Sequence, residues 1–241
     1  MRFKRYKSEL DYSYALGMAP VIELINRRPE RVLAVYAHPE YRAESASSIF
    51  DICKARGLPC ETNQKIFNIA ADKENIFVIG VFSKGGEPLS PRRPHAVFVN
   101  PGDAGNLGAN MRTCLGFDIS DIAVIKPCAD INSPRTVRAS MGASFHVNAA
   151  EYASYGDYAA DFPDHVKYIF MLNGETELGG INFAENDDRI SLVFGNEAAG
   201  LPDEFLRYGR SIRIPHSGAI DSLNLSVAVG IAANAFYIKK R

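Results

Sequence analysis

Three segments in the second half of the chain combine small residues with polar side chains that could do chemistry. In the first, residues 100–113, a glycine-rich turn leads to Asn106 and Arg112. Such a turn after a strand can hold phosphate at a helix N-terminus. The spacing, however, is G-x-x-G-x-x-G and not the dinucleotide G-x-G-x-x-G, so a plain strand-to-helix turn explains the glycines equally well. Six residues separate Asn106 from Arg112, so we expect the turn to bend Asn106 back if both serve one site.

The second segment, residues 192–202, is an apolar strand followed by a loop of small residues around one carboxylate, Glu197. Ligands of open α/β sheets bind beyond the carboxyl ends of the strands. Small residues let backbone N–H and C=O groups approach a ligand closely. The setting favours a site role for Glu197 over a solvated loop charge.

The third segment, residues 214–231, runs from a short strand through a polar turn into a helix that is apolar on nearly every side. A helix of this kind must be buried in a core or against a partner. Yet Ser222, Asn224 and Ser226 stand at its start. Because buried polar groups cost free energy unless they are paired, we expect this helix start to meet a ligand, a backbone loop or another subunit.

The elements that must position these segments alternate between strand and helix. In the second half, apolar runs predict strands at 96–99, 122–125, 166–172, 190–194 and 212–214. Apolar periodicity and helix start and stop signals predict helices at 107–115, 134–141, 202–208 and 223–237. This alternation predicts an α/β fold with a mainly parallel sheet covered on both faces.

The first half predicts a small α/β unit with helices at 20–28 and 45–56 and strands at 32–37 and 76–82. Residues 83–95 hold three prolines and two glycines, which exclude a continuous helix or a central strand. We therefore expect one domain at 1–85, a linker at 86–95 and a second domain at 96–241.

Composition limits the function classes. The net charge of −1 argues against a uniformly basic nucleic-acid binder. Residues 1–95 carry 15 Lys+Arg and 11 Asp+Glu, a net of +4, and the remainder carries 12 and 17, a net of −5. This mild asymmetry permits RNA binding by the first half. The cysteines show no metal or redox spacing, and no apolar run is long enough to span a membrane. We expect a cytoplasmic protein with reduced thiols and no bound metal.

The three segments, in this order, resemble motifs 1, 2 and 3 of the SpoU (TrmH-like) RNA 2′-O-ribose methyltransferases of the SPOUT superfamily. Motif 1 matches through Asn106, Gly108 and Arg112, motif 2 at 194–201, and motif 3 through 214–215, Gly218 and 222–228. Arg135, Ser140 and Gly142 also fit the segment that links motifs 1 and 2. The resemblance covers about residues 95–241. The first half resembles, less closely, the L30e-like substrate-binding domain that many members carry.

The resemblance implies S-adenosylmethionine as cofactor, a deep trefoil knot in the second domain and a homodimer through the C-terminal helix. The implied cofactor-binding residues are Phe194, Gly195, Glu197, Gly200, Ile214, Pro215, Ser222 and Leu223. The implied catalytic residues are Asn106, Arg112, Glu197, Ser222 and Asn224. The partner is RNA, and the additional N-terminal domain favours ribosomal RNA over transfer RNA by analogy.

Arg112 is read in this family as a base, but a guanidinium stays protonated at ordinary pH. We instead expect it to hold a phosphate and stabilise developing oxyanion character. Basic residues of the first half are candidate RNA contacts: Arg2, Lys4, Arg5, Lys7, Arg27, Arg28 and Arg31.

Two features depart from the family pattern. Asp103-Ala104 lengthens the motif 1 turn, and His216 stands where an apolar residue is common. We interpret His216 as a tolerated loop residue in preference to an RNA contact.

Two other function classes stay open: a catalytically silent RNA-binding or assembly protein, and a nicotinamide-dependent enzyme. Retention of the catalytic set disfavours the first, and the glycine spacing disfavours the second.

Overall fold

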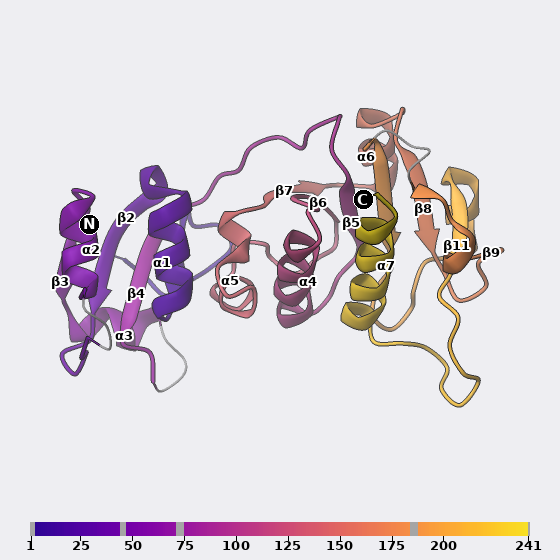
Figure 1. The fold of residues 1–241 in the computed structure, drawn as a ribbon. Coiled ribbons are helices and arrows are strands. Elements are labelled where there is room, and N and C mark those ends of the chain that lie inside the picture. Colours follow the sequence, from indigo (N-terminus) through magenta and orange to yellow (C-terminus); the bar gives the residue numbers. More distant parts are fainter. Residues whose placement is uncertain (1–2, 44–46, 71–74, 184–187, 241) are drawn as a thin grey trace.

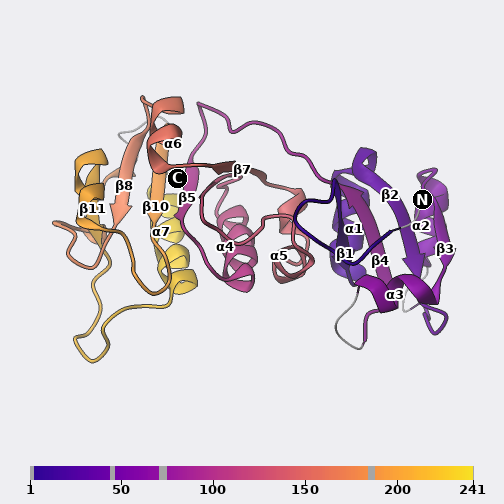
Figure 2. The same ribbon diagram turned by 180° about the vertical axis from the view of Figure 1, so that it is seen from behind.

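The computed structural model describes residues 3–43, 47–70, 75–183 and 188–240, which form two β-sheets with helices packed on them (Figures 1 and 2). Arg2 and Ser45, both named above, lie outside the described residues. The first sheet has the strand order β1-β4-β2-β3 and the second β7-β6-β5-β10-β8-β11-β9. Residues 84–94, which run between the two sheets, lie in no helix or strand.

The first sheet is mixed, because β1 and β2 pair antiparallel to β4 whereas β3 pairs parallel to β2. Its strands are β1 (Tyr12–Leu16), β2 (Val32–Ala37), β3 (Cys60–Thr62) and β4 (Val78–Ser83). Its helices are α1 (Met18–Arg27), α2 (Ile49–Ala55) and α3 (Gln64–Ala70). Apolar side chains of α1 and α2 pack on one face of the sheet, and those of α3 and Phe3 pack on the other.

The second sheet is parallel throughout, which confirms the expected α/β class. Its strands are β5 (His95–Val99), β6 (Asp121–Ile125), β7 (Asn148–Tyr152), β8 (Val166–Phe170), β9 (Thr176–Glu177), β10 (Ile190–Phe194) and β11 (Arg210–Arg213). Its helices are α4 (Ala104–Gly116), α5 (Pro134–Ala139), α6 (Tyr155–Asp161) and α7 (Leu225–Lys240).

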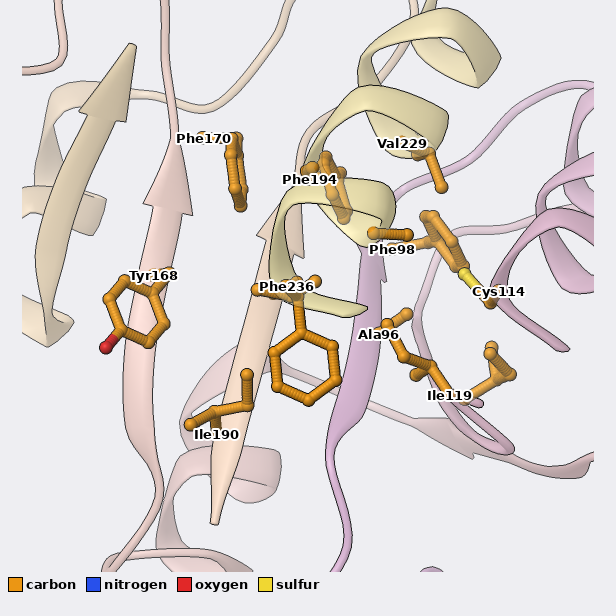
Figure 3. Packing of buried hydrophobic residues seen from close by; sticks show 14 of the residues in the cluster. Ala96, Phe98, Cys114, Ile119, Tyr168, Phe170, Ile190, Phe194, Val229 and Phe236 are labelled. Carbon is orange, nitrogen blue, oxygen red and sulfur yellow. The ribbon is translucent and has the colours of Figure 1, made fainter. Parts of the chain in front are cut away.

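Alternate residues of the central strands face opposite sides of this sheet, as the period of a strand requires. Phe98 packs beneath α4 and α7, whereas Val97 and Val99 join the cluster beneath α6. Figure 3 shows Val229 and Phe236 of α7 lying over the first of these faces. The three rings of Phe98, Phe194 and Phe170 stack in sequence across β5, β10 and β8, with centroid distances of 5.9 and 4.7 Å.

The two sheets are joined by a packed interface around α5, which lies between them in Figure 1. Val137 of α5 and nearby Phe145 are buried in the same apolar cluster as α1 and β4. Phe145 meets Phe82 edge to face at 5.0 Å, and His146 Nε2 lies 2.5 Å from the carboxylate of Glu23. The two units therefore share a core.

Most expected elements of the second half are present, with three differences. Asp203–Tyr208 forms a 3₁₀ helix, η5, and not an α-helix. Helix α4 begins at Ala104 and not near Leu107, because Asp103 caps it: its Oδ1 accepts a hydrogen bond from the N–H of Asn106 at 2.8 Å. Strands β7 and β9 and helix α6 of the second half were not predicted, nor were β1, β3 and α3 of the first half.

Helix α7 is buried on only one face in the single chain. Val229, Ala232, Ala233 and Phe236 are buried, whereas Val227, Ile231 and Ile238 are 50, 39 and 62% exposed. The apolar pattern of α7 therefore exceeds what packing within one chain requires. The knotted chain path stays a prediction. Among the described residues, none of the helices is sufficiently long and apolar to cross a membrane.

Candidate active site

The carboxyl ends of β8, β10 and β11 open into a cavity of about 350 Å³. The loop after β10 and the segment between β11 and α7 enclose it, and Phe170 and Phe194 form part of its wall. The residues that line it are Phe170–Asn173, Phe194–Leu201, Asp203, Ile212, Ile214, His216, Ser222, Leu223, Leu225 and Ala228. A cavity of this size matches a small-molecule site and lies where parallel sheets bind ligands.

The loop after β10 is folded tightly on itself. Asn196 N–H donates to Gly200 O at 3.2 Å, and Gly200 N–H donates back to Asn196 O at 2.9 Å. A Cβ atom on Gly195 would lie 2.2 Å from the carbonyl carbon of Gly200, so only glycine fits there. Gly200 has a φ of 64°, in the region that glycine adopts without strain.

Asn196 holds this loop in place. Its side-chain Nδ2 donates to Asn100 O, at the end of β5, at 2.8 Å. Its Oδ1 accepts from the N–H groups of Ala198 and Ala199 at 2.9 and 3.2 Å. Asn196 thus fixes the loop both to the end of β5 and to its own backbone.

Glu197 links the loop to the start of α4. Its carboxylate accepts hydrogen bonds from Gly102 N–H at 3.1 Å and from Asp103 N–H at 3.4 Å. The side-chain amides of Asn106 and Asn196 each donate to it at 3.3 Å. Burial alone would raise the pKa of Glu197, but hydrogen bonds from backbone N–H groups and from Asn106 outweigh burial and lower that pKa. Glu197 is therefore an ionised structural brace and is poorly suited to accept a proton.

The start of α4 lies beside Glu197 because Gly108 lets this helix approach α5 closely. A Cβ atom on Gly108 would lie 2.3 Å from Thr136 O and 2.8 Å from Ser140 N. Beside this contact, Arg135 Nη2 lies 2.6 Å from Asp103 Oδ2 in an ion pair that is largely exposed. The additional Asp103 of the motif 1 turn thus caps α4 and holds Arg135.

At the other side of the cavity, Asn224 caps α7. Its Oδ1 accepts from Ser226 N–H at 2.9 Å, and its carbonyl accepts from the N–H groups of Val227 and Ala228 at 3.0 Å. Capping of this kind is a structural role that the residue performs with or without a ligand. Its side-chain N–H₂ group has no hydrogen-bond partner among the described residues.

The structure brings most of the expected cofactor residues together. Seven of them line the cavity: Phe194, Gly195, Glu197, Gly200, Ile214, Ser222 and Leu223. Pro215 is exposed and is outside the lining, as are the expected catalytic residues Asn106 and Asn224. Asn106 nevertheless contacts Glu197, so it belongs to the same cluster.

Arg112 is exposed on α4, away from the cavity lining, and has no hydrogen-bond or ion-pair partner among the described residues. The expected bend that returns Asn106 toward Arg112 is wrong, because both residues lie in one continuous helix. Six helical residues separate them by about 9 Å along the axis and about 120° around it. Asn106 faces Glu197 while Arg112 is free for a group outside the cavity.

The sequence interpretation missed several residues that shape the site. Phe170, the last residue of β8, and Asn173, which follows that strand, both line the cavity, and Asn173 Nδ2 donates to Asp203 Oδ1 at 3.2 Å. His216, interpreted as a tolerated loop residue, also lines the cavity. Their position at the carboxyl end of a parallel strand was the available signal for Phe170 and Asn173.

Two buried polar side chains near the site lack partners within the described chain. Asn110 of α4 is fully buried with neither amide atom hydrogen-bonded, and Ser226 Oγ of α7 is likewise unpaired. No group of three or more His, Cys, Asp or Glu side chains suited to a metal occurs in the described ranges.

Several known proteins are similar to this chain in sequence and in fold. The sequence model of the SpoU rRNA Methylase family matches residues 93–234. An uncharacterized tRNA/rRNA methyltransferase of Mycobacterium tuberculosis H37Rv is 33% identical over 62% of this chain and 52% of its own length. The 23S rRNA (adenosine(1067)-2′-O)-methyltransferase of Streptomyces azureus is 31% identical over 53% of this chain and 48% of its own. The chain thus spans about half the length of these curated relatives.

The fold comparison extends over both sheets. The crystal structure of an AdoMet-bound rRNA methyltransferase from Sinorhizobium meliloti has a TM-score of 0.78 at 28% identity, covering 94% of this chain and 87% of that one. The SpoU methyltransferase AviRb from Streptomyces viridochromogenes shares the fold, with a TM-score of 0.77 at 18% identity over 95% and 90% of the two chains. The family match covers more than half of the chain, including the cavity and the Glu197 cluster, so this protein belongs to the SpoU rRNA Methylase family.

Proposed function

We propose that this protein is an S-adenosylmethionine-dependent RNA methyltransferase that methylates a ribose 2′-hydroxyl. The observation that carries the proposal is the cavity enclosed by the loop after β10 and the segment before α7, braced by Glu197. It is supported by the relative from S. meliloti, whose crystal structure is described as AdoMet-bound.

The residues present fit this cofactor chemically. Phe170 and Phe194 offer apolar surface, and the small residues Gly195, Ala198, Ala199 and Gly200 line the cavity without bulky side chains. Glu197 and Asp203 give the cavity a negative character, and none of its lining residues is Lys or Arg. A cationic sulfonium group suits such surroundings. We assign cofactor binding to Phe194, Gly195, Glu197, Gly200, Ile214, Pro215, Ser222 and Leu223.

The bound cofactor would supply an electrophilic methyl group, so the chain mainly has to align a ribose hydroxyl with it. We assign Arg112 the adjacent phosphate and the developing negative charge on the 2′-oxygen, because its guanidinium is charged and unengaged. Asn106, Ser222 and Asn224 would orient the substrate. Glu197 would hold Asn106, the turn before α4 and the loop after β10 in their relative positions.

A direct test is transfer of a labelled methyl group to RNA, followed by nuclease digestion and mass spectrometry of the nucleosides. The proposal expects label in 2′-O-methyl nucleosides, and label on a base would refute it. Calorimetry with S-adenosylmethionine and with NAD separates the other classes. A silent RNA-binding protein would bind RNA without methylating it, and a nicotinamide enzyme would bind NAD.

For the RNA class, we propose ribosomal RNA. The relative from S. azureus carries the name of a 23S rRNA enzyme, but that from Listeria innocua, 28% identical over 58% of this chain and 83% of its own, is named a putative tRNA (cytidine(34)-2′-O)-methyltransferase. Parallel assays with purified ribosomal and transfer RNA decide the question. Methylation of transfer RNA alone would contradict the proposal.

We also propose a homodimer through α7, because Val227, Ile231 and Ile238 leave an apolar face exposed. Arg112, which lies outside the cavity of its own chain, could then serve a site completed by the partner. Ile231→Asp should convert the protein to a monomer in light scattering, whereas the change Lys65→Asp on α3 should not. A wild-type chain that is monomeric at micromolar concentration would refute the dimer.

We propose residues 1–85 as an L30e-like RNA-binding domain, followed by a linker at 86–95 and the methyltransferase domain at 96–241. The exposed Lys4, Arg5, Lys7 and Arg27 remain candidate RNA contacts. Arg28 and Arg31 are less suited to this role, because both guanidinium groups bind backbone carbonyls at the interface between the sheets. Charge reversal at Lys4 and Lys7 should weaken RNA binding and leave cofactor affinity unchanged.

A further inference from the structure

A small cavity of about 30 Å³ lies between the two units, at the interface around α5. Arg28, Arg31 and Phe82 line it from the side of the first sheet, and Asn132 and Ser144 line it from the other. Because these polar groups line one small, partly open space and belong to both units, an occupant here would contact both at once.

Arg31 brings a positive charge to this cavity and has no carboxylate within ion-pair distance among the described residues. Its Nε donates to Ser83 O at 2.9 Å, and its guanidinium carbon lies 5.3 Å from the centre of the Phe82 ring. Its Nη2 atom is buried and has no hydrogen-bond partner within the described residues. Burial and the charge of Arg28 lower the pKa of Arg31, and only Glu30 opposes them. A guanidinium stays charged in proteins nonetheless.

Arg28 adds a second cation with neutral partners. Its Nε donates to Phe145 O at 3.2 Å and its Nη2 to the side-chain oxygen of Asn148 at 3.4 Å. Neither Arg28 nor Arg31 has a carboxylate within ion-pair distance in the described part of the chain. Two neighbouring cations without a counter-charge are costly away from water.

We propose that this cavity binds a small monovalent anion of the size of chloride or bromide. Charge favours an anion over a neutral water molecule, because both guanidinium groups lack a negative partner. Size excludes a phosphate group, because about 30 Å³ holds one or two water-sized particles. Asn132 and Ser144 offer N–H and O–H donors from the second unit, and Phe82 offers the apolar surroundings that a weakly hydrated halide tolerates. By contacting both units, the bound anion stabilises the interface between them.

Bromide crystallography of the full chain tests the site directly. Crystals grown or soaked in bromide should show an anomalous peak beside Arg31 Nη2 that is absent from crystals of Arg31→Met. Clear density for water with no anomalous peak at saturating bromide would overturn the proposal.

A solution test does not depend on crystals. The unfolding midpoint of the wild type should rise by about 2–4 °C when sodium gluconate is replaced by sodium chloride at equal ionic strength. Arg31→Met should lose this difference. Arg27→Met, which removes an exposed charge at the last residue of α1, four residues before Arg31, should keep this difference. Equal responses in the wild type and in Arg31→Met would show that chloride acts elsewhere.

Discussion

Strands β5, β10 and β8 carry polar residues at both of their ends, but the two ends are built for different purposes. At the carboxyl end lie the open cavity, the exposed loop after β10 and the Glu197 cluster. At the amino end lies a closed network of His95, Tyr158, Ser191 and His165, each at most 4% exposed.

Hydrogen bonds account for every side chain of the amino-end network. His95 Nε2 donates to Ser90 O at 2.8 Å, so its Nδ1 accepts from Tyr158 Oη at 2.9 Å. Tyr158 Oη and Ser191 Oγ lie 2.6 Å apart, and His165 Nε2 lies 3.1 Å from Pro91 O. The network therefore binds the segment at 90–91 to the sheet and leaves no group free for a ligand.

The contrast teaches how to separate a functional polar cluster from a structural one in this fold. Histidine is a common acid–base catalyst, yet both histidines here are buried without access to a cavity. Burial and the neighbouring His165 lower the pKa of His95 to about 3, and burial also lowers that of His165. Both are neutral at pH 7, and the chemistry belongs to the opposite edge.

The largest expected effect comes from Glu197→Ala at the carboxyl end. The change leaves Gly102 N–H, Asp103 N–H and the Asn106 amide without their acceptor, which should cost about 1–3 kcal/mol locally and loosen both cavity loops. We expect methyl transfer to fall below detection, measured with labelled S-adenosylmethionine and RNA. Activity within threefold of wild type would exclude Glu197 as the brace of the site.

Arg112→Ala should have the second-largest effect, with a loss of about 10²–10³ in kcat and no loss of thermal stability, because Arg112 has no partner among the described residues. Arg112→Lys keeps the charge but not the two-pronged geometry, so it should recover only part of the activity. Single-turnover rates with saturating RNA measure both variants. Near-normal turnover of Arg112→Lys would contradict bidentate phosphate binding.

At the amino end the expected effect is on stability and its pH dependence. Because the folded pKa of His95 lies below its ordinary value of 6.5, its contribution is fully present above about pH 6.5 and is lost as pH falls toward 3. The free energy of unfolding should then drop by up to about 1.4 kcal/mol per pH unit from this residue alone. Urea unfolding of the wild type and His95→Gln between pH 7.5 and 5 measures the difference, and parallel slopes would contradict the assignment.

The smallest effect is expected for the exposed pair between Arg135 and Asp103. Asp103→Asn keeps the helix cap but removes the charge, so stability should change by only about 0.2–1 kcal/mol. Asp103→Leu, which removes the cap as well, should cost more and should also lower activity through Asn106. Thermal melts and methyl-transfer rates of the two variants separate the contribution of the helix cap from that of the ion pair. Equal melting points for the two variants would deny Asp103 its capping role.

The sequence predicted the central strands well because their apolar runs are uninterrupted. Ile190–Phe194 and Val32–Ala37 appear at the predicted bounds, and Asp121–Ile125 begins one residue earlier. Strand β7 was missed because Asn148–Tyr152 is an edge strand with only partly buried residues. Helix α6 had a readable signal that went unused, since Ser154 and Asp157 form a capping box.

The motifs identified the cavity loops but not their internal contacts. Glu197 binds Gly102 and Asp103, which lie more than 90 residues away, and such pairings depend on strand order and not on local pattern. The need for glycine at 108 likewise comes from Thr136 and Ser140 of α5. The displacement of Arg112 from the cavity could not be foreseen while the start of α4 was placed three residues late.

Calorimetric titration of S-adenosylmethionine into Glu197→Ala, Arg112→Ala and His95→Gln tests most directly the claim that the carboxyl edge of the sheet is the functional one. All three are to be measured at pH 7.5, with folding verified by circular dichroism. We predict a Kd at least tenfold higher for Glu197→Ala, and values within twofold of wild type for Arg112→Ala and His95→Gln. Unchanged affinity for S-adenosylmethionine in Glu197→Ala, together with lost affinity in folded His95→Gln, would contradict the claim that the carboxyl edge is the functional one.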